Sequence, residues 1–177
     1  MLFSLTIIAV VLGLVILVQW RATTREAAAD AAYPPIGELI DIDGVRVHAK
    51  VQGSGPDLVL IHGASGNMRD FTFDMVDQLT DRYRVILFDR PGLGWTDNLP
   101  QHAGAWNATA ATPHEQATLL QKAADRLGVS NPIVLGHSYG GAVALAWGSC
   151  VPMKRRRWCS PRACQSRGRV ILAGSTS

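Results

Sequence analysis

The sequence predicts an α/β fold that follows a single transmembrane helix. Three short apolar runs show little alternation of polar and apolar residues, which is typical of parallel strands buried on both faces. These runs are Leu58–Ile61, Arg84–Phe88 and Pro132–Leu135. Segments with helical spacing separate them, and alternation of strand and helix indicates a parallel sheet with right-handed crossovers. A hairpin precedes the three runs, and an apolar stretch opens the chain.

Residues 2–20 are predicted to be a membrane anchor. Their almost unbroken apolar run, at 1.5 Å of rise per residue, is about long enough to cross a hydrocarbon core of roughly 30 Å. Trp20 and Arg21 follow the run, and an aromatic ring and a cation suit the membrane–water interface. The next residues, 21–37, are rich in alanine and are predicted to be a linker to the folded body.

A cleaved signal peptide is the alternative interpretation of this N-terminal stretch. A signal peptide carries a basic start and an apolar core of about 7–15 residues, and this chain has no basic side chain before Leu2 and a longer core. The alanines at 27–29 and 31–32 still offer a cleavage site. Arg21 and Arg25 weakly favour a cytoplasmic body, so the sequence leaves the side of the membrane open.

The net charge of +3 hides two unlike parts of the chain. Residues 151–177 contain seven basic side chains and no carboxylate, which leaves ten basic against all 14 acidic residues before them, a net charge of −4. The basic overall balance therefore predicts no nucleic-acid partner. The three cysteines, Cys150, Cys159 and Cys164, match no common zinc spacing and predict no metal site.

A hairpin is expected from two strands, Glu38–Ile42 and Val45–Val51, on either side of Asp43-Gly44. This dipeptide is a strong signal for a tight two-residue turn. The second strand alternates, with Val45, Val47, Ala49 and Val51 on one face, so we expect its other face to lie in water. His48 falls on that wet face and is predicted to be a surface histidine.

Two helices are predicted between the parallel strands. Arg69–Tyr83 has apolar residues close to helical spacing. The second helix has clearer boundaries: Thr112 and Glu115 form a capping box and Pro113 occupies its first helical position. Gly128 is expected to end it.

The feature that carries the chemistry is a G-x-S-x-G motif between the last parallel strand and an apolar helix, 141–147. A serine pushed into a strained strand-to-helix turn exposes its hydroxyl, and small flanking residues are needed because a Cβ there would strike its neighbours. The motif consists of Gly136, His137, Ser138, Tyr139 and Gly140. Read in this context it predicts a nucleophilic serine.

Two more loops follow strands in the same way. His62-Gly63-Ala64 comes directly after the first parallel strand. Asp89-Arg90-Pro91-Gly92-Leu93-Gly94 comes after the second, and lacks the third glycine that a dinucleotide-binding loop requires. We expect Asp89 to order its loop rather than to take part in catalysis.

With these three motifs in this order, residues 38–148 resemble the N-terminal half of the α/β-hydrolase superfamily. The resemblance implies Ser138 as the nucleophile, with the backbone N–H groups of Ala64 and Tyr139 as the oxyanion hole. Supporting loop positions would be His62, Gly63, Gly136, His137 and Gly140. It implies a small-molecule acyl substrate such as an ester, thioester, lactone or carbon–carbon bond, and no metal or organic cofactor. A serine in the motif points away from the members that use a carboxylate nucleophile, epoxide hydrolases and dehalogenases.

The chain departs from that family after Ser138, where neither a carboxylate nor a histidine follows, although the family's triad order requires both. The segment 149–168 gathers arginine, cysteine and proline abruptly, which suggests translation in a wrong reading frame, followed by early termination. A basic segment that contacts phospholipid headgroups is the alternative. Residues 169–177 again have the composition of a strand.

Whether the chain is an active enzyme therefore stays open at the level of sequence. The favoured function is a membrane-anchored serine hydrolase that is inactive as this chain. The alternative is a catalytically silent anchored binding domain or a non-functional fragment. Membrane lipid is the expected partner of the N-terminal helix, and the oligomeric state is not predicted.

Overall fold

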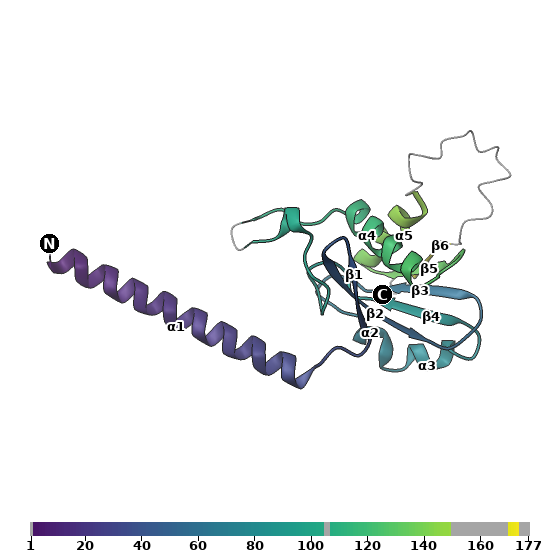
Figure 1. Ribbon diagram of the computed structural model, residues 1–177, viewed down its shortest axis with the longest axis horizontal. Helices are drawn as coiled ribbons and strands as arrows, with labels where there is room; N and C mark the ends of the chain where they lie inside the picture. Colours follow the sequence, from purple (N-terminus) through teal and green to yellow (C-terminus); the bar gives the residue numbers. More distant parts are fainter. Residues whose placement is uncertain (1, 105–106, 150–169, 174–177) are drawn as a thin grey trace. The chain divides into compact units, whose positions relative to one another are not determined.

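A computed structural model describes residues 2–104, 107–149 and 170–173 of the chain (Figure 1). It divides into two units, Met1–Ile36 and Gly37–Ser177. Apart from α1 (Leu2–Ala32), every helix and strand below belongs to the second unit, called here the body.

The first unit is the single long helix α1. Its stretch Thr6–Ala32 has a mean hydropathy of 1.9 and is long and apolar enough to cross a membrane, a property that a signal sequence shares. The prediction of a linker over 21–37 was wrong for its first part, because the helix continues to Ala32. Alanine, arginine and glutamate, which dominate this part, are strong helix formers. The helix ends just before Pro34, because proline disfavours helical backbone in the residue before it.

The body is built on a six-stranded sheet with the strand order β1-β2-β4-β3-β5-β6. The first three strands pair antiparallel, and β4, β3, β5 and β6 are parallel to one another, as the α/β prediction required. The strands are β1 (Glu38–Ile42), β2 (Val45–Gln52), β3 (Asp57–Ile61), β4 (Arg84–Phe88), β5 (Ile133–His137) and β6 (Val170–Ala173).

The hairpin of β1 and β2 is confirmed, with Asp43 and Gly44 both at positive φ (55° and 84°), the conformation of a type I′ turn. The expectation of a wet face on β2 was wrong at His48, which is 1% exposed. The loop that follows β4 covers this face: the His48 N–H donates to the Thr96 hydroxyl (2.9 Å), and Nδ1 of His48 lies 2.7 Å from Oδ2 of Asp89.

The crossover between β3 and β4 is not the single helix expected over Arg69–Tyr83. It forms two short helices, α2 (Arg69–Thr72) and α3 (Met75–Leu79). The break falls at Asp74, whose φ of −154° is far from helical, and it leaves the Phe73 side chain 95% exposed. The helical spacing of apolar residues gave no indication of this break.

The helix α4 (Pro113–Arg126) has the predicted capping box. The Thr112 hydroxyl accepts the Glu115 N–H (3.3 Å), and the Glu115 carboxylate accepts the Thr112 N–H (2.8 Å). Hydrogen bonds to the Glu115 carboxylate, first from the Thr112 N–H and then from the side chains of Thr112, Gln101 and His102, lower the pKa of Glu115 to about 2. Gly128 at φ 68° follows the C-terminus, as expected.

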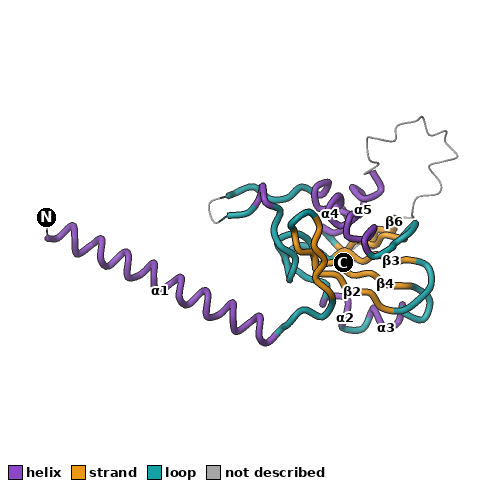
Figure 2. Tube along the Cα trace, viewed as in Figure 1, coloured by secondary structure: helices purple, strands orange, loops and turns teal. Residues whose placement is uncertain are grey.

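Helices cover the sheet on both faces: α4 and α5 (Tyr139–Ser149) lie on one side, and α2 and α3 lie on the other (Figures 1 and 2). Alternate residues of β3 therefore face opposite layers, and all are buried from Leu58 to Ile61. Val59 and Ile61 belong to the core under α4 and α5 together with Ile86, Phe88, Val134 and Val143. This two-sided burial explains the short apolar runs in the sequence.

The strand expected within 169–177 is present as β6, which pairs parallel with β5. The segment 149–168, for which frame disruption is predicted, lies outside the described residues except for Ser149 at the end of α5. The three cysteines also lie outside them.

Candidate active site

The carboxyl ends of three parallel strands bring the three sequence motifs to one edge of the sheet. β3 lies between β4 and β5, and its last residue Ile61 pairs with Phe88 on one side and Gly136 on the other. The loops that begin at His62 and Asp89, and the turn at Ser138, therefore start side by side. In open α/β sheets this edge is where ligands bind.

Ser138 occupies the turn between β5 and α5. Its backbone has a φ of +52°, an uncommon conformation for any residue with a side chain. The residue is exposed, and its carbonyl accepts the Gly141 N–H (2.9 Å) in the first turn of α5. The turn therefore holds the serine outside the buried strand at the start of a helix, where free N–H groups create a positive potential.

The glycines of the motif are required by close backbone contacts. A Cβ on Gly136 would collide with the Gly140 carbonyl, and a Cβ on Gly140 would collide with the Ile61 carbonyl and lie 2.6 Å from that of His62. Strand β5, helix α5 and the end of β3 thus approach more closely than any side chain permits. This close approach is the steric reason for glycine at positions 136 and 140 that the motif predicted.

The loop after β3 packs directly against this turn. A Cβ on Gly63 would lie 3.3 Å from the Ser138 Cβ and 3.0 Å from Nδ1 of His137. The two segments are more than seventy residues apart in the chain. The structure therefore places Ser138 beside the 62–66 loop, as the resemblance implied, and it gives the exposed His137 side chain no hydrogen bond to any described residue.

The backbone N–H groups of Ala64 and Tyr139 have no acceptor among the residues that the structure describes, and the same holds for Gly63, Ser65 and Gly66 in the loop after β3. Tyr139 is the first residue of α5, so its N–H has no partner within the helix. Ala64 follows Gly63 in the loop that contacts Ser138. These are the two amides that the sequence singled out.

His62 is fully buried and joins two of the loops. Its Nε2 accepts the Arg90 N–H (2.9 Å), so its proton sits on Nδ1, which lies 2.9 Å from the Gly63 carbonyl oxygen. Burial lowers the pKa of His62. The hydrogen bond to the Gly63 carbonyl opposes this shift, and the charge of Arg90 adds to it. The imidazole is therefore a neutral structural link.

Asp89 orders the loop after β4, as expected. Its Oδ1 accepts the Met68 N–H (2.7 Å), and its Oδ2 accepts the Trp95 N–H (3.0 Å) and lies 2.7 Å from Nδ1 of His48. Since Nε2 of His48 accepts the Gly37 N–H (3.0 Å), Nδ1 is the protonated nitrogen. Burial alone would raise the pKa of Asp89, but these hydrogen bonds outweigh it and hold the pKa below its ordinary value.

Arg90 is a residue of this edge that the sequence reasoning did not single out. It is 4% exposed, and it donates to the Gln116 side-chain oxygen (2.9 Å) and the Gly63 carbonyl (2.7 Å). Its guanidinium lies 4.9 Å from the centre of the Tyr139 ring. Burial lowers its pKa. The sequence feature that could have identified Arg90 is its position directly after Asp89, at the end of a buried strand.

A pocket of about 460 Å³ lies at this edge. Its wall includes Ala64, Arg90 and Tyr139, and most of the remainder comes from loop residues between Pro91 and Ala111. Ala64 and Tyr139 therefore line a cavity of the size of a small-molecule site, whereas Ser138, the residue before Tyr139, is not among its lining residues.

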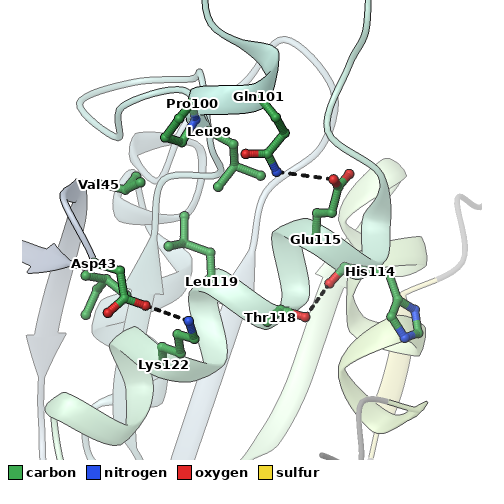
Figure 3. A pocket seen from close by; sticks show the side chains of 11 residues that line it. Asp43, Val45, Leu99, Pro100, Gln101, His114, Glu115, Thr118, Leu119 and Lys122 are labelled. Carbon is green, nitrogen blue, oxygen red and sulfur yellow. Dashed lines mark hydrogen bonds and ion pairs between the residues drawn. The ribbon is translucent and has the colours of Figure 1, made fainter.

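A second pocket, of about 350 Å³, lies against α4 and the hairpin turn (Figure 3). Asp43 and Lys122 form an ion pair at its rim (2.6 Å), and Gln101 donates to Glu115 (3.2 Å). None of the predicted site residues lines it, so the pocket beside Tyr139 is the candidate active site.

Comparison with known proteins agrees with this architecture. Residues 58–176 match the model of the Alpha/beta hydrolase family. The chain is 36% identical over 120 residues to the dihydrolipoyllysine-residue acetyltransferase component of the acetoin cleaving system of Cupriavidus necator, covering 67% of this chain and 29% of that protein.

Two solved structures are similar in fold. E-2-(acetamidomethylene)succinate hydrolase matches with a TM-score of 0.56 and 25% identity, over 66% of this chain and 40% of that one. A bacterial membrane phospholipase A matches with a TM-score of 0.59 and 23% identity, over 92% of this chain and 50% of that one. The chain thus spans half or less of the length of each of these proteins.

Proposed function

Because the chain belongs to the alpha/beta hydrolase family, we propose that it derives from a serine hydrolase that cleaves an ester or a similar acyl bond, with Ser138 as nucleophile. The observation that carries the proposal is the exposed serine at φ +52° between β5 and α5, packed against Gly63 of the loop after β3. A strained backbone persists only where the surrounding structure enforces it, and such positions cluster at active sites.

In the proposed reaction, Ser138 Oγ attacks the carbonyl carbon of the substrate and gives its proton to a base. The carbonyl oxygen becomes an oxyanion, which accepts the N–H groups of Ala64 and Tyr139. Collapse of this intermediate breaks the acyl bond, the leaving group takes up a proton, and water then cleaves the acyl-enzyme to release the acid. Both amides lack another acceptor among the described residues, which supports this assignment.

The proposed reaction needs a base that takes up the Ser138 proton. No histidine or carboxylate follows Ser138, and an alcohol without a base is a poor nucleophile at neutral pH. Oxyanion stabilisation and binding alone leave a residual acceleration of about 10³–10⁴ over water in triad-deleted enzymes. A second candidate function, which needs no base, is a catalytically silent domain that binds a ligand in the pocket of about 460 Å³ beside Tyr139.

A fluorophosphonate probe separates the two candidates. The proposed hydrolase becomes covalently labelled, at a slow rate because no histidine or carboxylate follows Ser138 in this sequence, and the labelling disappears in Ser138→Ala. Ser65→Ala is the matched control, since Ser65 is also exposed, also at positive φ (58°) and on the neighbouring loop. A folded wild-type chain that takes up no label would reject Ser138 as the nucleophile and leave the silent domain. A label that persists in Ser138→Ala would also reject Ser138 and assign the labelling to another residue.

We also propose that α1 anchors the protein in a membrane, on the strength of its apolar stretch Thr6–Ala32. The test is extraction of membranes with alkaline carbonate, combined with N-terminal sequencing of the mature protein. An anchor stays in the membrane pellet with the apolar stretch intact. Cleavage after the alanines near residues 27–32 would instead identify a signal peptide.

A further inference from the structure

The carbonyl oxygen of Gly63 receives two hydrogen bonds from buried side chains. Nδ1 of His62 lies 2.9 Å away, and a terminal nitrogen of Arg90 donates from 2.7 Å. Both donors are themselves held in place, because the Arg90 N–H donates to Nε2 of His62 (2.9 Å). The carbonyl is thus fixed by two groups from two different loops.

Fixing this oxygen also fixes the direction of the next N–H. The Gly63–Ala64 peptide is planar and trans, since the structure contains no cis peptide among its described residues, so its C=O and N–H point to opposite sides. With the oxygen held on the side of His62 and Arg90, the Ala64 N–H is directed away from them. That N–H has no acceptor among the described residues, and Ala64 lines the pocket.

The guanidinium of Arg90 is clamped from two further sides. Its other terminal nitrogen donates to Gln116 (2.9 Å), and Gln116 is tied to the Ala111 carbonyl (2.8 Å). The Tyr139 ring lies against the guanidinium at 4.9 Å, within range of a cation–π contact. Arg90 therefore contacts both residues whose positions matter for the proposed oxyanion hole, the Gly63–Ala64 peptide and Tyr139.

A contribution to stability does not explain why the guanidinium of Arg90 is buried here. Arg90 forms no ion pair with any described carboxylate, and its buried Nε has no hydrogen-bond partner in the described structure. A buried, unpaired charge costs free energy that an apolar side chain would not. A guanidinium does, however, offer several N–H donors in a rigid plane, which suits a group that must hold a peptide in one orientation.

We infer that Arg90 is a positioning residue, which holds the Gly63–Ala64 peptide so that the Ala64 N–H is already directed at the developing oxyanion. The inference rests on the proposed function, since it assigns the amide of that same site. Hydrogen bonds to the Gly63 carbonyl also polarise the peptide and strengthen its N–H as a donor. Arg90 does this through the peptide, although its side chain also lines the pocket.

The kinetics of fluorophosphonate labelling test the inference. In Arg90→Met we expect the maximal labelling rate of Ser138 to fall about 10- to 100-fold, somewhat less than the loss of a whole oxyanion donor, with the probe's half-saturating concentration nearly unchanged. Arg90→Lys keeps one donor for the Gly63 carbonyl and should recover part of the rate. Gln116→Met frees the guanidinium without removing it, and should give a smaller loss even if Arg90→Met unfolds.

The matched control is Arg46→Met, which removes an arginine that is bonded to Asp97 at the surface of the same body. It should label at the wild-type rate. Folded Arg90→Met and Gln116→Met variants that also label at the wild-type rate would overturn the inference.

A second measurement does not depend on activity. Loss of a hydrogen bond to a carbonyl changes its ¹³C chemical shift, so the Gly63 carbonyl signal should move in Arg90→Met and stay in place in Arg46→Met. An unlabelled wild-type chain with this movement would reject the nucleophile and support the held peptide. An unmoved signal would reject the held peptide, whatever the labelling shows.

Discussion

The loop after β4 offers a sharp test of how this edge of the sheet is held together. In Asp89→Asn one carboxylate oxygen becomes an amide nitrogen, which cannot accept a hydrogen bond. If the nitrogen replaces Oδ1 it faces the Met68 N–H, and if it replaces Oδ2 it faces both Trp95 N–H and the protonated Nδ1 of His48. Either orientation leaves at least one buried donor without an acceptor.

The expected loss follows from these contacts. An unsatisfied buried donor costs about 1–3 kcal/mol, and a hydrogen bond to a neutral acceptor is weaker than one to a carboxylate by about 1 kcal/mol. Removal of the buried charge offsets part of this, because burial opposes ionisation of Asp89. We therefore expect Asp89→Asn to lower the free energy of unfolding of the body by about 2–4 kcal/mol.

Urea unfolding of the full chain in mild detergent, followed by circular dichroism, measures the loss. Asp97→Asn is the matched control from the same loop. Its carboxylate is 35% exposed and bonds to Arg46, whose side chain is 62% exposed, so about 0–1 kcal/mol should be lost. Equal losses in the two variants, or less than about 1 kcal/mol for Asp89→Asn, would refute the claim that Asp89 anchors this loop.

The pH dependence of the free energy of unfolding tests the contribution of the same carboxylate. The folded pKa of Asp89 lies below its ordinary value of 3.8, so the carboxylate contributes stability above that pH and loses it as the pH falls through the folded pKa. The difference between the wild type and Asp89→Asn should therefore narrow below about pH 4. A difference that stays constant down to about pH 2 would contradict the lowered pKa.

Three further predictions concern the helix caps and the serine turn. Thr112→Ala should cost about 1 kcal/mol in urea unfolding, because it removes the N-cap of α4, and an unchanged midpoint would contradict the capping role. An NMR titration of Glu115 should give a pKa of about 2, and an ordinary value would mean that the capping box is open in solution. Gly140→Ala should destabilise the body by about 1–3 kcal/mol or more and abolish probe labelling, since its Cβ would meet the Ile61 carbonyl. Gly13→Ala in α1, with open space at its Cβ, should do neither.

The sequence predicted those parts of the fold that depend on local chemistry. The Asp43-Gly44 turn, the Thr112 cap and Gly136 each depend on the backbone within a few residues, and each has the predicted form. Gly140 was predicted from the motif, although the backbone it contacts, at Ile61 and His62, is distant in sequence. The parallel strands were predictable because burial on both faces leaves an apolar run that few other elements produce. The three loops share one edge of the sheet because these strands run in the same direction, whereas their order along that edge was not predicted.

What the sequence could not predict depends on parts of the chain that pack from a distance. Alternation in β2 correctly assigned His48 to the opposite face from Val47, but it carries no information on whether another segment covers that face. Here the loop after β4 does, through Asp89. Arg90 was missed for the same reason, because its partners Gly63 and Gln116 lie 27 and 26 residues away.

The central position of β3 has a consequence for how the protein is made. Its two neighbours in the sheet are β4, which follows after a short crossover, and β5, which ends at His137. A ribosome that adds about 5–20 residues per second leaves the β5 side of this apolar strand without a partner for several seconds. During biosynthesis the nascent chain therefore exposes an aggregation-prone edge at the centre of its future sheet until β5 has been made.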